Sequence, residues 1–151
     1  MKLLSIPVGV SDFEEIRRNG YYYVDKSGLI GELLSTTGTK VTLITRPRRF
    51  GKTLGMSMLS SFFDIRRDSE ELFSNLDIMN DSVLCQQWMN QWPVIFLSMK
   101  DIDGLSYQKA YEQFVLQISE LYKRYTYVLE CEAIDPDDKE LFLLLKAGQA
   151  S

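Results

Sequence analysis

Two short apolar runs are the clearest feature in the pattern of hydrophobic and polar positions along the chain. Residues 41–45 and 94–99 are mostly aliphatic, β-branched or aromatic and have the length of a typical strand. Such runs are characteristic of strands that are buried on both faces of a sheet. A different spacing begins at Lys52, where apolar side chains recur about one helical turn apart as far as Arg67. The first run therefore predicts a strand that a loop joins to a helix.

The remaining periodicity predicts further helices, several of which have recognisable capping residues. Ser11 and Glu14 fit a capping box at a helix start. Ser106 precedes a long amphipathic stripe, and Asp135 precedes Pro136 in a favoured N-terminal arrangement. The expected helices cover residues 11–18, 25–35, 52–67, 69–75, 81–89, 106–125 and 136–146.

The order of these elements predicts the fold class. Alternation of strands and helices is typical of α/β proteins whose strands run parallel. The chain has 151 residues, which is the length of one ordinary domain. We therefore expect residues 1–151 to form a single α/β domain in which helices flank a parallel sheet.

Composition excludes several kinds of active site. The chain has no histidine, so it cannot form a Ser-His-Asp or Cys-His triad or a His-ligated zinc site. Cys85 and Cys131 form no CxxC pair, which favours free thiols in a reducing compartment. The net charge of −4 argues against a generally basic nucleic-acid coat. No run reaches the roughly 18 apolar residues of a membrane helix and no signal peptide is recognised, so we expect a cytoplasmic protein with no membrane partner.

The loop before the helix that starts at Lys52 carries the candidate chemistry. Residues 46–53 read Arg-Pro-Arg-Arg-Phe-Gly-Lys-Thr and match the end of the phosphate-binding P-loop, G-x-x-x-x-G-K-[ST]. In this pattern Gly51 permits close backbone approach, Lys52 reaches the phosphates, and the Thr53 hydroxyl binds Mg²⁺. Arg46 stands where the motif begins with Gly, and the proline after it lacks a backbone donor. Arginine side chains can compensate, because guanidinium groups bind phosphate oxygens through two hydrogen bonds.

The same arginines leave a second interpretation open. Arg46, Arg48 and Arg49 could instead bind the phosphate backbone of a nucleic acid, or form a basic turn in an interaction module. Nucleic-acid binding of this kind weakens steeply as salt is raised, because it releases condensed counterions. A comparison of DNA and ATP binding would distinguish the two interpretations.

Several stretches of the chain resemble one known protein family. Residues 6–13, 22–27, 43–54 and 93–98, followed by Lys100 and Asp101, occur in the order found in the bacterial AAA-ATPase-like family. The resemblance covers nearly the whole chain, and Arg in place of the first P-loop Gly is usual in that family. It implies a P-loop NTPase-like parallel sheet flanked by helices and a site for ATP with Mg²⁺. The implied nucleotide-binding residues are Arg46, Arg48, Arg49, Phe50, Gly51, Lys52, Thr53 and Leu54, with Thr53 as the Mg²⁺ ligand.

The resemblance also implies parts that are not recognised in this chain. Family members hold Mg²⁺ and activate water with acids that directly follow an apolar Walker B strand. Residues 94–99 lack such acids, and Asp101 comes too late. We therefore expect the N-terminal part of an ATPase, truncated before the Walker B strand and with no identifiable catalytic residue. Many members carry a nuclease-like C-terminal domain, which would add nucleic acid as a partner, and the resemblance leaves oligomer formation open.

Other suggestive residues have simpler structural interpretations. Tyrosines 21–23 form a short segment of strand composition and could pack in the core or line an adenine pocket. Capping of a helix is a simpler account of Asp25 and Lys26 than contact with a nucleotide. The aromatic stripe of residues 106–125 is expected to be core, and the acids at 101–103 are expected to flank a turn.

Overall fold

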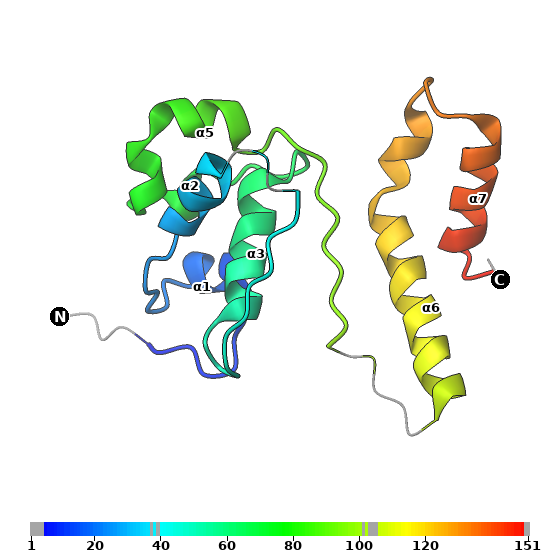
Figure 1. The fold of residues 1–151 in the computed structure, drawn as a ribbon, viewed down its shortest axis with the longest axis horizontal. Coiled ribbons are helices and arrows are strands. Elements are labelled where there is room, and N and C mark those ends of the chain that lie inside the picture. Colours follow the sequence, from blue (N-terminus) through cyan, green and yellow to red (C-terminus); the bar gives the residue numbers. More distant parts are fainter. Residues whose placement is uncertain (1–4, 37, 39, 101, 103–105, 150–151) are drawn as a thin grey trace. The chain divides into compact units, whose positions relative to one another are not determined.

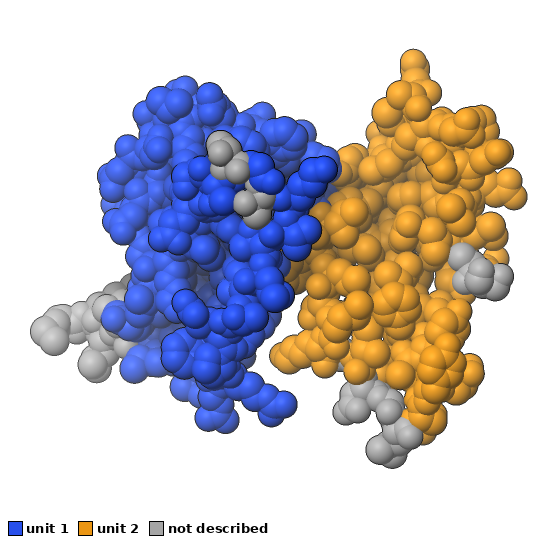
Figure 2. All heavy atoms as spheres, viewed as in Figure 1, with its two compact units in different colours: residues 1–94 blue, residues 95–151 orange. Residues whose placement is uncertain are grey.

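The protein consists of two compact units, residues 1–94 and residues 95–151, drawn in blue and orange in Figure 2. The structure is a computed structural model that describes residues 5–36, 38, 40–100, 102 and 106–149. Helices form the regular secondary structure in both units (Figure 1). Each unit has its own helices and its own packing.

The first unit is built from five α-helices and one 3₁₀ helix in the part of the chain that the structure describes. They are α1 (Phe13–Arg18), α2 (Gly28–Ser35), α3 (Lys52–Phe63), α4 (Glu70–Phe73), η1 (Asp77–Asn80) and α5 (Ser82–Trp88). The predicted capping box is displaced by one residue, because the Asp12 side chain caps α1 by accepting a hydrogen bond of 2.8 Å from the Glu15 backbone N–H. Asp81 caps α5 in the same way through the Leu84 N–H, at 3.0 Å. Carboxylates suit these positions because they satisfy backbone donors at the positive end of the helix dipole.

An aromatic cluster forms the core of the first unit. Phe13 of α1 packs against Phe73 of α4 with ring centroids 4.8 Å apart, and Phe62 of α3 meets Phe73 edge to face at 5.3 Å. All three rings are fully buried, together with Ile30 and Met58. Burial of each large side chain contributes about 1.5–3 kcal/mol. The core therefore fixes α3, whose first residue is Lys52, the lysine of the predicted P-loop.

Helix α3 ends at Phe63, before the predicted end at Arg67, because Asp64 ties the chain into a turn. The Asp64 carboxylate is 1% exposed and accepts hydrogen bonds from the backbone N–H and the guanidinium of Arg66. Burial raises the pKa of this carboxyl, but the bonds from Arg66 outweigh that effect and hold the pKa below its ordinary value. The Ile65 N–H then donates to the Trp92 carbonyl at 2.8 Å, within an isolated parallel bridge.

The second unit is a helical hairpin. It contains α6 (Tyr107–Arg124), η2 (Thr126–Glu130) and α7 (Pro136–Lys146), and the predicted caps Ser106 and Asp135 are confirmed for α6 and α7. Tyr122 packs edge to face on Phe142 at 4.7 Å, and the Ser119 hydroxyl donates to the Lys146 carbonyl at 2.6 Å. The predicted stripe of residues 106–125 is core only in part, because Tyr125 is buried whereas Tyr111 is 42% exposed. None of the described helices combines the length and the apolar character that crossing a membrane requires.

The prediction of an α/β fold with a parallel sheet was wrong. Residues 21–24, 41–45 and 94–99 form no strand, and the described residues contain no sheet. Val41 is 83% exposed and Ile95 is 73% exposed, so these runs are not buried on both faces. The physical reason is that a strand is stable only when a neighbouring strand satisfies its backbone N–H and C=O groups, which a local apolar pattern does not reveal.

Candidate functional site

The predicted P-loop connects an irregular segment to the first turn of α3. Gly51 is the N-cap residue of α3 and has a φ of +76°, in the left-handed region that favours glycine. Arg49 also lies in this region, with a φ of +67°, which is uncommon for a residue with a side chain. These two conformations turn the chain sharply before Lys52, and the Gly55 N–H donates to the Gly51 carbonyl at 2.8 Å as the helix begins.

The side chain of Lys52 binds back to the backbone of its own loop. Its Nζ donates to the backbone carbonyl of Arg46 at 2.5 Å and to that of Pro47 at 2.9 Å. An ammonium group has three N–H donors, so two are used within the loop and the third is available for another acceptor. The lysine therefore lies among the residues of its own loop, where it can add a phosphate oxygen without giving up these bonds.

The other predicted site residues differ in their exposure. Arg46, Arg48, Arg49 and Phe50 are exposed, as is Thr53 on the first turn of α3, whereas Leu54 is half-buried and packs against the core. Among the described residues, neither Arg48 nor Arg49 has a carboxylate partner. The loop thus carries cationic groups that are accessible to a polyanion.

A cavity of about 420 Å³ lies beside Gly51 in the first unit. Its walls combine the segment before α1, the tyrosine segment and the end of the P-loop, including Pro7, Tyr22, Lys26, Phe50 and Gly51. Pockets of about 300–1,000 Å³ with mostly apolar walls are the usual size for small ligands. The cavity therefore adds a space of ligand size next to the loop.

Two neighbouring tyrosines of residues 21–23, Tyr22 and Tyr23, have different environments. Tyr23 packs edge to face on Phe13 at 5.4 Å and donates its hydroxyl to the Met58 sulfur at 3.2 Å. Burial raises the pKa of Tyr23. Tyr22 is 50% exposed, and both Tyr22 and Tyr23 line the cavity. One residue of the segment is thus largely core, while its neighbour offers an accessible ring.

Asp25 was expected to cap a helix, but the N-cap residue of α2 is Ser27, and Asp25 anchors this segment to η1, which sequence reasoning missed. Its carboxylate accepts hydrogen bonds from the Ser27 N–H at 2.8 Å and from the Asp77 N–H at 2.7 Å. The buried Ser27 hydroxyl accepts another from the Ile78 N–H at 3.1 Å. Burial raises the pKa of Asp25, but these hydrogen bonds outweigh it and lower the pKa below its ordinary value. The Asp-x-Ser spacing signals the local turn, whereas nothing in the sequence signals the bonds to η1.

No assembled metal site was found in the part of the chain that the structure describes. Its Cys, Asp and Glu side chains form no group of three or more that could hold an ion. Cys85 and Cys131 are free thiols, as predicted. Asp101 and Asp103, which were expected to flank a turn, lie outside the described residues.

Comparisons with known proteins identify the family of the chain. The model of a family described as predicted AAA-ATPase matches residues 7–147. A relative, the uncharacterized protein in the vnfD 5' region of Azotobacter chroococcum mcd 1, is 35% identical over 99 residues. That alignment covers 65% of this chain but 17% of the relative, so the chain spans much less than two thirds of that protein. No solved structure matches the chain.

Proposed function

The chain belongs to the AAA-ATPase-like family of predicted AAA-ATPases, and we propose that it binds ATP with Mg²⁺ at the loop of residues 46–53. The observation that carries this proposal is the position of Lys52, whose Nζ holds two loop carbonyls and retains a donor for a phosphate oxygen. The loop leads into the N-terminus of a helix of 12 residues, which favours anions.

Each residue of the loop has a chemical role in this proposal. Lys52 binds the β- and γ-phosphates, and the Thr53 hydroxyl is the protein ligand of Mg²⁺. Gly51 allows the backbone to approach the phosphates, because a side chain there would be strained at a φ of +76°. Arg48 and Arg49 supply positive charge in place of the backbone donor that Pro47 lacks.

The cavity beside Gly51 provides space for the nucleoside. It is continuous with the loop through Phe50 and Gly51, and Tyr22 offers an exposed ring on its wall. Aromatic rings stack on nucleobases with little dependence on the base, so the cavity favours a nucleotide over free phosphate without selecting adenine.

ATP hydrolysis is proposed for the whole protein. It requires a group that activates water, and the sequence shows no acidic pair directly after an apolar run. We therefore expect the chain of residues 1–151 to bind Mg·ATP without releasing phosphate above background.

Thermal unfolding with and without nucleotide tests the site. A ligand that binds only the folded state stabilises it by about 2.7 kcal/mol at 100 times its Kd. Since each kcal/mol shifts the Tm of a unit of 60–100 residues by roughly 4–8 °C, saturating Mg·ATP should raise the Tm of the first unit, residues 1–94, by about 11–22 °C. Lys52→Ala should remove the shift, and AMP should give a smaller one.

A DNA-binding titration tests the alternative interpretation, nucleic-acid binding. Binding of duplex DNA that falls steeply with salt and is unaffected by Lys52→Ala would favour it. Cooperative unfolding with a Tm that Mg·ATP leaves unchanged would contradict the ATP proposal.

A further inference from the structure

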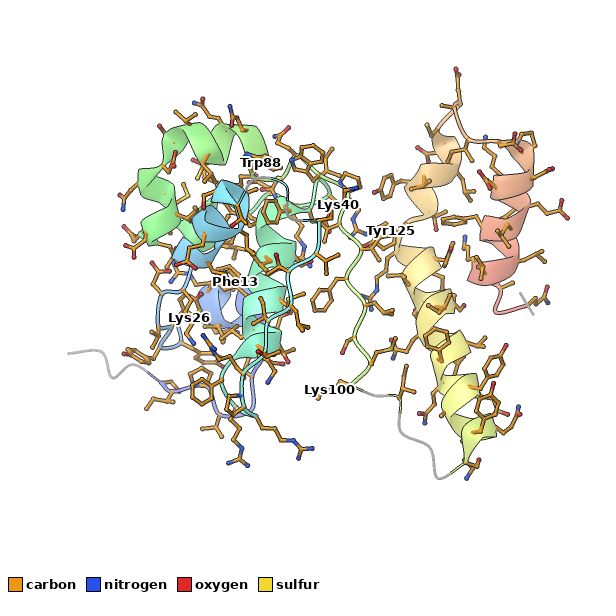
Figure 3. The ribbon with its side chains drawn as sticks, in the orientation of Figure 1. Phe13, Lys26, Lys40, Trp88, Lys100 and Tyr125 are labelled. Atoms are coloured by element: carbon orange, nitrogen blue, oxygen red, sulfur yellow. The ribbon has the colours of Figure 1, made fainter. Side chains whose placement is uncertain are left out.

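A second lysine reaches the same loop from a distant part of the chain. Lys26 lies between the tyrosine segment and α2, and it lines the cavity beside Gly51. A Cβ atom placed on Gly51 would be 3.7 Å from the Lys26 Nζ. Figure 3 shows Lys26 in the first unit, apart from Lys40. The ammonium of Lys26 therefore lies against the backbone at the residue that begins α3.

Hydrogen bonds to η1 hold the residues on both sides of Lys26. Asp25 accepts hydrogen bonds from the Ser27 and Asp77 N–H groups, and the Ser27 hydroxyl accepts one from Ile78. Ser27 is fully buried, and hydrogen bonds lower the pKa of Asp25 below its ordinary value, which already leaves the carboxyl ionised at neutral pH. The backbone of Lys26 is thus fixed between two residues that are bound to η1.

The side chain of Lys26 has no structural use that explains this placement. Among the described residues no carboxylate forms an ion pair with its ammonium group. The nearby Asp25 carboxylate is occupied by two backbone donors. A cation in this position has its donors available for an anion at the start of α3.

We propose that Lys26 is a second phosphate-binding residue, which contacts the phosphate chain of a nucleoside di- or triphosphate together with Lys52. Lys52 holds the carbonyls of residues 46 and 47, whereas Lys26 faces Gly51 and the cavity. The two ammonium groups come from different parts of the chain and reach different parts of the loop. This inference rests on the proposed function, because it requires a phosphate chain at the loop.

The test measures the affinity of the full chain for Mg·ATP by titration calorimetry, in the wild type and four variants. Lys26→Met keeps the length of the side chain and removes its charge, whereas Lys26→Arg keeps the charge. Lys40→Met is the matched control, because Lys40 is also an exposed lysine of the first unit and does not line the cavity. Lys52→Ala reports on the proposed P-loop itself.

We expect Lys26→Met to weaken Mg·ATP binding by about tenfold, the loss typical of one hydrogen bond to a charged group. Lys26→Arg should recover most of the affinity, and Lys40→Met should match the wild type. The Tm without ligand should be the same for all Lys26 variants. Inorganic tripolyphosphate, used as a competitor of ATP, should lose affinity in Lys26→Met by a similar factor, because the proposed contact is to phosphate.

Three outcomes would overturn the inference. If Lys52→Ala abolishes binding but Lys26→Met binds Mg·ATP as tightly as the wild type, Lys26 is not a ligand and the proposed function stands. If Lys26→Met weakens ATP but not tripolyphosphate, the side chain contacts the nucleoside and not the phosphates. If the wild type itself binds no Mg·ATP, the proposed function fails and this inference fails with it.

Discussion

Replacing Asp25 by alanine should destabilise the first unit and leave the second unit unchanged. The substitution removes the acceptor of two backbone hydrogen bonds, from Ser27 at 2.8 Å and from Asp77 at 2.7 Å. Hydrogen bonds to a charged group contribute about 1.5–3 kcal/mol each. Because Asp25 is only half-buried and water can reach the freed donors, we take the low end for each bond and expect a total loss of about 3 kcal/mol.

Tryptophan fluorescence is the assay of choice, because it reports on the first unit alone. The chain has two tryptophans, Trp88 and Trp92, and both lie within residues 1–94, with their rings stacked at 5.2 Å. Urea unfolding followed at this signal gives the free energy of unfolding of the first unit. Circular dichroism also includes the helices α6 and α7.

Asp68→Ala is the matched control for this measurement. Asp68 is an exposed carboxylate of the same unit, for which we find no interaction with another described residue, so its replacement should change the free energy by less than about 0.5 kcal/mol. Asp25→Asn should fall between the wild type and Asp25→Ala, because the amide keeps one oxygen acceptor.

The pH dependence of this effect has a definite sign. Since folding lowers the pKa of Asp25, its carboxylate stabilises the folded state above the unfolded pKa, and this contribution is lost as the pH falls through the folded pKa. The difference between wild type and Asp25→Ala should therefore be full at pH 7 and shrink below about pH 4. An Asp25→Ala protein that unfolds at the same urea concentration as Asp68→Ala at pH 7 would refute the anchoring role of Asp25.

Two further predictions concern Arg49 and Asp64. Arg49→Gly should raise the free energy of unfolding by about 0.5–1 kcal/mol, because glycine adopts the positive φ without strain, and a lower stability in urea would contradict this. The same substitution should weaken Mg·ATP binding about tenfold, because it removes a charged hydrogen-bond donor. Asp64→Asn should cost about 2 kcal/mol at pH 7, less than a fully buried ion pair because Arg66 is 30% exposed. Folding also lowers the pKa of Asp64, so the wild type should lose more stability than Asp64→Asn as the pH falls from 5 through the folded pKa of Asp64. Equal losses in the two proteins would contradict a stabilising role for the Asp64 carboxylate.

Helix starts were predictable from the sequence because their signals are local. Ser106 and Asp135 cap α6 and α7 as expected, since each accepts a hydrogen bond from a residue two or three positions later. The start of α3 at Lys52 was predictable from another local signal, the change to helical spacing of apolar residues after Gly51. Its end was not predictable, because the turn at Asp64 also depends on residues far along the chain. The Asn90 amide donates to the Asp64 backbone carbonyl, and the Ile65 N–H donates to the Trp92 carbonyl.

The sheet failed as a prediction for the opposite reason. Strand pairing depends on partners that are distant in sequence, and an apolar run records only a preference for them. The candidate site shows the same difference between local and long-range signals. The loop of residues 46–53 was located from a contiguous motif, whereas the anchoring of Asp25 joins residues 52 positions apart and left no local pattern.

The exposed segment of residues 94–99 has a consequence for how copies of the molecule meet. It is a six-residue window without charge or proline, and Ile95 and Met99 expose 73% and 55% of their surface. Windows of this kind are the ones that form cross-β aggregates, in which identical segments stack edge to edge. Pro93 and Lys100 flank this window. Both are typical gatekeeper residues, because proline has no backbone donor for a strand partner and the charge of lysine repels its copy in a stack. They limit the stacking of such a segment beyond its ends.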